Sequence, residues 1–119
     1  MEHKDLERML NSAYSGLSLA RANLFEAGNS LIKWNMELNT EKNRLISSGG
    51  ITGKNVAERE ADLSTKLTYQ YEKVNDAEVA EREMRYRFDM AGYKVEEARA
   101  LLRLAQLANG GNNGNQGSH

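Results

Sequence analysis

Apolar residues recur along the first part of the chain with the spacing of a coiled coil. Leucine stands at every seventh position from Leu10 to Leu45, and Leu6, Ala13, Ala20, Ala27 and Trp34 alternate with these leucines. This alternation of three and four residues places the apolar side chains along one stripe of an α-helix. It predicts a first helix over about residues 4–46.

The same pattern resumes after a glycine-rich loop over residues 47–53 and predicts a second helix over about 54–108. The apolar positions there are Leu63, Leu67, Val74, Ala77, Met84, Phe88, Ala91, Val95, Ala98, Leu102 and Ala105. Folding the chain at the loop brings large residues opposite small ones, such as Leu24 opposite Ala77, as close packing requires. The predicted fold class is therefore all-α: a long antiparallel two-helix coiled-coil hairpin, with residues 1–108 forming a single domain.

The loop has the residues expected at a helix-to-helix turn. Its glycines can supply the left-handed conformation that ends a helix, and Thr52 is a candidate N-cap for the second helix. Gly53-Lys54 matches the end of a phosphate-binding loop, but the first glycine, the magnesium-binding hydroxyl and a preceding strand are missing. Within the first helix, the heptad crosses Gly28-Asn29-Ser30 without a phase shift. This favours a continuous helix, although glycine could break it there.

Composition limits the remaining possibilities. The chain has 119 residues, no proline and no cysteine, and its net charge is −1. An interior proline would cost a helix about 3 kcal/mol, so its absence suits long helices. No apolar run approaches the roughly 20 residues that cross a bilayer, and no signal peptide is evident. We therefore expect no membrane association and a cytoplasmic protein. Residues 109–119, rich in glycine and asparagine, are predicted to be a disordered tail, and Gly117-Ser118-His119 resembles the start of an expression tag.

A two-helix hairpin would leave further apolar residues uncovered, and these are the candidate interface. They comprise Phe25, Ile32 and Met36 on the first helix and Tyr86, Met90, Tyr93, Leu101, Leu104 and Leu107 on the second. Contiguous exposed apolar patches commonly mark protein interfaces. The second helix is also predicted to extend past the first beyond about Val95, which would leave residues 98–108 uncovered. A homodimer that forms a four-helix bundle would cover both features, and an unidentified protein partner is the other possibility.

The residues provide no catalytic, cofactor-binding or metal-binding pattern, so the sequence predicts a protein that is not an enzyme and needs no cofactor. His3 is the only histidine outside the terminal tripeptide. Carboxylate pairs such as Glu58 and Asp62 are interpreted as a solvated helix face. Basic residues around Tyr86 and Tyr93 alternate with acidic ones, which favours pairs within the helix over nucleic-acid binding.

Two short motifs resemble known proteins. Gly53-Lys54-Asn55-Val-Ala-Glu-Arg59, and an ending Glu96-Glu-Ala-Arg-Ala-Leu-Leu-Arg, resemble small helical-hairpin accessory proteins of tailed phages and prophages. The resemblance covers about residues 51–108 and implies a non-enzymatic accessory protein in the host cytoplasm. The architecture also resembles secreted WXG-type hairpins, and Tyr93 with Glu97 fits their export signal. However, the tryptophan-x-glycine turn of that class is missing.

The function predicted from sequence is therefore a protein-protein interaction module that binds a host or phage protein through apolar helix faces. One alternative is a DNA-associated accessory protein of a phage recombination or replication module. The other is a secreted WXG-like hairpin.

Overall fold

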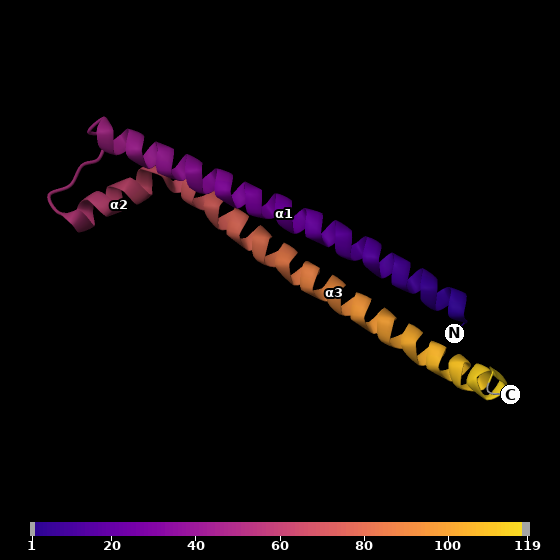
Figure 1. The fold of residues 1–119 in the computed structure, drawn as a ribbon. Helices are drawn as coiled ribbons and strands as arrows, with labels where there is room; N and C mark the ends of the chain where they lie inside the picture. The colour runs from indigo at the N-terminus through magenta and orange to yellow at the C-terminus, as the bar shows by residue number, and fades with distance from the viewer. Residues whose placement is uncertain (1, 118–119) are drawn as a thin grey trace. The chain divides into compact units, whose positions relative to one another are not determined.

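The computed structural model describes the backbone of residues 2–117 and the side chains of residues 2–109. Its elements are the helices α1 (His3–Ser47), α2 (Val56–Lys66) and α3 (Thr68–Gly117), and no strand occurs among the described residues (Figure 1). The predicted all-α class is thus confirmed. The helix α1 runs without interruption through Gly28, as the unbroken heptad predicted.

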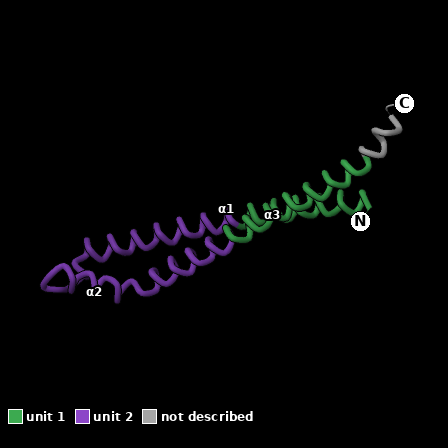
Figure 2. Tube along the Cα trace, turned by 90° about the horizontal axis from the view of Figure 1, so that it is seen from below, with its two compact units in different colours: residues 1–23, 85–119 green, residues 24–84 purple. Residues whose placement is uncertain are grey.

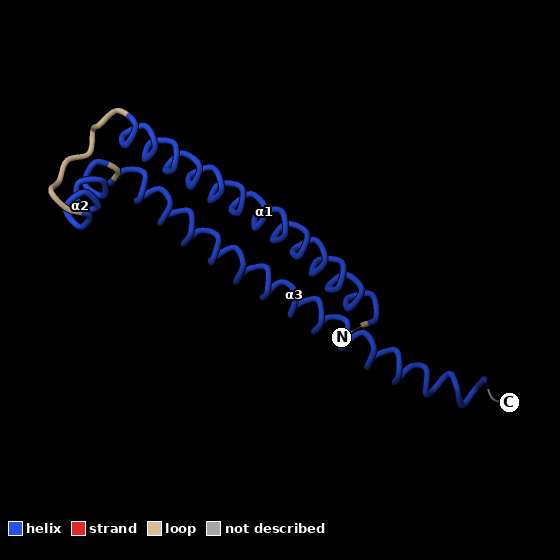
Figure 3. The backbone as a smooth tube through the Cα atoms, turned by 60° about the vertical axis from the view of Figure 1, so that its left-hand side comes forward, coloured by secondary structure: helices blue, strands red, loops and turns tan. Residues whose placement is uncertain are grey.

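The chain divides into two compact units, which Figure 2 colours separately. Unit 1 contains residues 1–23 and 85–119, and unit 2 contains residues 24–84. Within each unit, a segment of α1 lies beside a segment of α3 that runs in the opposite direction (Figures 1 and 2). In unit 2 the connection consists of a loop and α2, and the loop is the longer tan segment of Figure 3.

The predicted heptad stripes are the least exposed part of each helix. In unit 1, Leu6, Val95 and Ala98 are buried. In unit 2 the buried residues are Leu63, Leu67, Val74 and Ala77. The leucines of α1 from Leu10 to Leu45 are half-buried, while the residues of the opposite face are exposed. Burial of apolar area is the main favourable term in folding, so these stripes form the cores of the two units.

The end of α1 is a glycine-terminated cap. Gly49 has φ +71°, its N–H donates to Ile46 O over 3.3 Å, and the N–H of Gly50 donates to Leu45 O over 2.9 Å. These two bonds define a Schellman motif, in which glycine takes the left-handed conformation at no steric cost. The predicted left-handed glycine is confirmed. One turn earlier, the Arg44 guanidinium bonds Glu41, and this contact raises the pKa of Arg44.

The predicted single helix over 54–108 is wrong, because the chain breaks helical geometry at Leu67. That residue has φ −106° and ψ 19°, which separates α2 from α3. On either side, threonine hydroxyls donate to the helix backbone: Thr65 to Ala61 O, and Thr68 to both Ser64 O and Thr65 O. Hydroxyls that bond back in this way bend helices. Leu67 itself is only 1% exposed, so the break coincides with the most deeply buried large side chain of unit 2.

The predicted uncovered part of the second helix also needs correction. Ala98 is only 1% exposed, although the pairing of the sequence placed it beyond the first helix. The helix α1 begins at His3, and the N–H groups of Asp5 and Leu6 both donate to Glu2 O, so Leu6, the first buried residue, lies in a complete first turn. Side chains beyond residue 109 lie outside the described residues, and the disordered tail over 109–119 remains a prediction.

Candidate interaction surfaces

The first candidate surface is the outer stripe of α3 in unit 1. Its members Tyr86, Met90, Tyr93, Ala100, Leu104 and Leu107, with Glu97 at the remaining position, repeat every three or four residues. Tyr86, Tyr93 and Leu104 are each 64% exposed, and Leu107 is 65% exposed. This spacing is that of a second coiled-coil seam on a helix whose other seam is already covered. We call this set the α3 outer seam.

The second candidate surface is the outer stripe of α1 in unit 2. Phe25, Ile32, Met36 and Ile46 are exposed by 69%, 60%, 64% and 57%. They lie away from the half-buried leucines: Phe25, Ile32 and Ile46 each follow a leucine directly, and Met36 follows Leu31 by five positions, which turns the stripe about 100–140° from those leucines around the helix. Large apolar side chains that stay this exposed lose the free energy that burial would provide.

All nine residues predicted as interface are thus exposed, each by 37% or more. The structure places Phe25, Ile32 and Met36 in unit 2 and the other six in unit 1. Leu101, which is 37% exposed, flanks the α3 outer seam. Their role in binding stays a prediction, since exposure alone does not show what covers them.

The motif Gly53-Lys54-Asn55 with Glu58 and Arg59 has a structural function at the start of α2. Asn55 is the N-cap: its side-chain oxygen accepts the N–H of Glu58 over 2.9 Å. The Glu58 carboxylate accepts the N–H of Lys54 over 2.7 Å, and Arg59 Nε donates to Gly53 O over 3.2 Å. This closely resembles a capping box, which satisfies the free N–H groups of the first turn. The prediction of Thr52 as the N-cap is therefore wrong.

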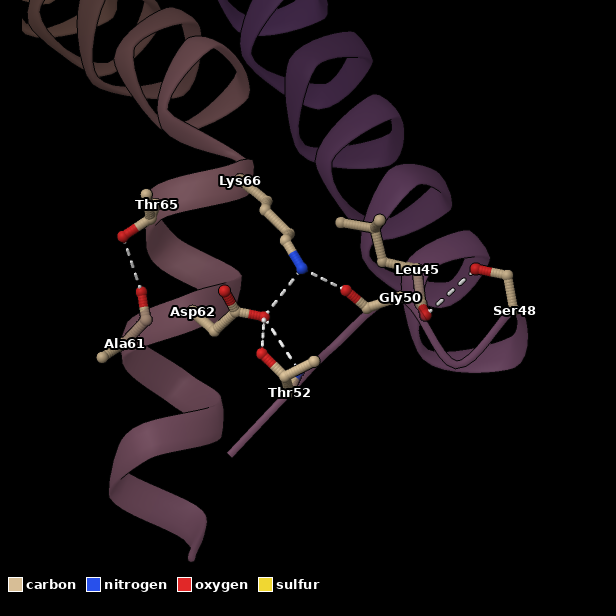
Figure 4. A network of polar contacts seen from close by, with 8 residues as sticks. All are labelled: Leu45, Ser48, Gly50, Thr52, Ala61, Asp62, Thr65 and Lys66. Atoms are coloured by element: carbon tan, nitrogen blue, oxygen red, sulfur yellow. Dashed lines mark hydrogen bonds and ion pairs between the residues drawn. The ribbon is translucent and has the colours of Figure 1, made fainter. Parts of the chain in front are cut away.

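Asp62 ties the loop to α2 (Figure 4). One of its oxygens accepts the N–H of Thr52 over 2.9 Å and bonds Lys66 Nζ over 2.9 Å. The Lys66 ammonium also donates to Gly50 O. The hydrogen bond from the Thr52 backbone, followed by that from Lys66, lowers the pKa of Asp62. Glu58 and Asp62, interpreted from sequence as a solvated face, therefore both hold backbone N–H groups of the loop.

Between the end of α1 and the start of α2 lies an open apolar hollow of about 330 Å³. Its lining residues are Ile46, Gly49, Ile51, Val56, Arg59 and Glu60. Val56 is 69% exposed, and no sequence pattern indicates it as part of a surface. A single apolar residue at a helix start has no periodic pattern, so only the fold reveals that it shares a hollow with Ile46.

An aromatic cluster marks another part of unit 2. The rings of Trp34 and Tyr69 meet edge to face, with centroids 6.1 Å apart. The Lys73 ammonium lies 5.8 Å from the Trp34 centroid and 5.5 Å from that of Tyr69, and Lys33 lies 5.4 Å from Trp34. Such cation–π contacts stabilise exposed aromatic rings by about 0.5–1 kcal/mol each.

The described part of the chain holds neither a metal-binding cluster nor a membrane-spanning helix. No group of three or more acidic, histidine or cysteine side chains gathers there in a manner that suits a metal ion. None of the described helices combines the length and the apolar character needed to cross a bilayer.

Comparison with known proteins gives no match: no family model fits the chain, and no curated protein or solved structure resembles it significantly. The resemblance to phage accessory proteins therefore stays a prediction. The structure assigns a capping role to one motif of that resemblance, since the asparagine of Gly53-Lys54-Asn55 is the N-cap of α2.

Proposed function

We propose that this protein is a non-enzymatic interaction module: an antiparallel coiled-coil hairpin that associates through the outer faces of its helices, first of all with a second copy of itself. A dimer of two such hairpins would form a four-helix bundle. A protein of the host or the phage is the further partner that the sequence resemblance implies.

The α3 outer seam is the observation that supports this proposal. Its apolar positions keep a heptad spacing from Tyr86 to Leu107 while their side chains stay largely exposed. A residue that only faces water has no need of this spacing, whereas a helix that receives another helix does. A copy of the same chain is present wherever the protein is made, so it is the first partner available to cover these residues.

Replacing Leu104 and Leu107 with glutamate tests the proposal. Sedimentation should show that the wild-type dimer dissociates in this double variant, while far-UV circular dichroism retains most of the helical signal. Two buried charges per copy would oppose association, because an unpaired charge in an apolar interface is strongly unfavourable. A dimer whose dissociation constant is unchanged by both substitutions would exclude the α3 outer seam as part of its contact.

The control also places two glutamates on α3 but off the seam, and it adds more negative charge than the test variant because one glutamate replaces an arginine. Arg99 and Gln106 are also exposed and lie outside the outer stripe. The Arg99→Glu, Gln106→Glu variant should therefore stay dimeric. Dissociation of this control as well would show that added negative charge alone breaks the dimer.

One observation favours the alternative of a DNA-associated protein. The lysines around Trp34 and Tyr69 combine positive charge with aromatic rings, as single-strand binding surfaces do. A gel shift at low salt with single- and double-stranded DNA would detect such binding. Retardation that weakens steeply as salt rises would favour this alternative over the interaction module.

A further inference from the structure

We propose that the outer stripe of α1 in unit 2 pairs with the same stripe of a second copy, as a parallel, in-register two-stranded coiled coil. The inference rests on the proposed function, since it takes the chain to be an interaction module. The partner of the α1 face is then a second copy of the chain, and the contact has a defined register.

The stripe keeps a strict coiled-coil spacing over three heptads. Its apolar members are Phe25, Ile32, Met36 and Ile46, and the positions between them are Asn29, Asn39 and Asn43. All seven side chains are exposed. Because this spacing matches the knobs and holes of a facing helix, the partner that covers the stripe is an α-helix.

The order of apolar and asparagine positions selects the partner and its register. In an in-register parallel pair, each asparagine meets the identical asparagine and each apolar residue meets its own copy. A slip of one heptad would place Asn29 against Met36, Ile32 against Asn39, and Asn43 against Met36. Each of those contacts leaves a buried amide without a hydrogen-bond partner, whereas facing asparagines can bond each other. Asparagine in a seam is known to specify register in this way.

Charge at the edges of the stripe permits the same arrangement. The first seam positions of the heptads are Asn29, Met36 and Asn43. In a parallel pair, the residue just before each of them lies beside the residue five positions later in the other chain. Lys33 would then lie beside Gly28 of the second copy, and Lys42 beside its Ser47. No like charges meet along this edge of unit 2.

The exposed area is also sufficient. Phe25, Ile32 and Met36 each expose three-fifths or more of their surface. With Ile46, covering the stripe in two copies removes on the order of 1,000 Å² from water, which is near the lower bound for a specific interface.

Cysteine cross-linking tests the inference directly, because the natural chain contains no cysteine. Under mild oxidation, Ile32→Cys and Asn39→Cys should each form a covalent dimer at least ~10-fold faster than Ser30→Cys. Ser30 is exposed on the same helix but lies outside the stripe. Asn39→Cys removes no apolar residue, so it remains informative if Ile32→Cys folds poorly.

Two results would overturn the inference. The first is cross-linking of Ile32→Cys and Asn39→Cys no faster than that of Ser30→Cys. The second is preferential linkage between Ile32→Cys and a tagged Met36→Cys chain, which would show an antiparallel pair. If either result occurs while the wild type is a dimer that Leu104→Glu, Leu107→Glu dissociates, the inference fails and the proposed function stands. If the wild type is a monomer, the proposed self-association fails as well.

Discussion

At the scale of single residues, the glycines of this chain have different physical roles. Gly53 has φ +152°, and an added Cβ would lie 2.7 Å from the backbone nitrogen of Arg59 and 2.9 Å from the carbonyl carbon of Glu58. Gly16, within α1, has open space around the position of a Cβ and an ordinary helical backbone. The first glycine is required by the loop geometry, whereas the second only reduces helix propensity.

The expected effects of alanine at these two positions have opposite signs. Gly53→Ala should destabilise the loop and α2 by about 1–3 kcal/mol, because it adds both a clash and a strained backbone. Gly16→Ala should stabilise the chain by about 0.5–1 kcal/mol. Urea unfolding followed by circular dichroism measures both. Equal effects of the two substitutions would contradict the role assigned to Gly53.

At the scale of elements, the position of α2 depends on polar contacts with the loop more than on packing. Leu63 is buried, but Val56 and most of the other α2 residues are exposed. The contacts from Glu58 and Asp62 to loop N–H groups therefore carry much of its attachment, and the Asn55 side chain caps its first turn by accepting the N–H of Glu58.

The attachment of the loop to α2 should depend on pH. The hydrogen bonds from Thr52 and Lys66 lower the pKa of Asp62 below its ordinary value of 3.8, so the folded state favours the carboxylate. The stabilisation is then present above pH about 4 and is lost as the pH falls through the lowered pKa. An NMR titration should give an Asp62 pKa below 3.8, with the Thr52 amide signal changing over the same range. In Asp62→Asn the Thr52 amide should lose this pH dependence, and its persistence would assign the effect to another group.

At the scale of the whole molecule, the proposed hairpin predicts a single unfolding transition. Far-UV circular dichroism should report more than about 80% helix for residues 4–108, since one loop interrupts an otherwise heptad-patterned chain. Trp34 is the only tryptophan and lies in unit 2, so its fluorescence reports that unit alone. The fluorescence and circular dichroism transitions should coincide. Separate midpoints would show that the two units unfold independently and would contradict the single transition.

Much of the candidate surface was predictable, because exposure on a long helix follows from sequence spacing. Phe25, Tyr86 and Leu104 lie on faces away from the heptad stripes, and the structure leaves them exposed. The N-cap at Asn55 was also predictable from the sequence, because Asn55-Val-Ala-Glu58 has the pattern of a capping box. The hollow beside Val56 was not predictable from the sequence, because only the turn between Ile46 and Val56 brings these two residues together.

The sequence by itself determined the helical class, the extent of α1, the glycine cap at Gly49 and the stripes that become buried. These features depend on residues within one or two turns of each other, where periodicity and propensity act directly. Tertiary structure alone decided the burial of Ala98 and the attachment of the loop through Asp62 and Lys66. Each of these depends on which segment lies opposite. A heptad pattern shows that a residue is covered, but it does not show which segment covers it or where along the helix the covering ends.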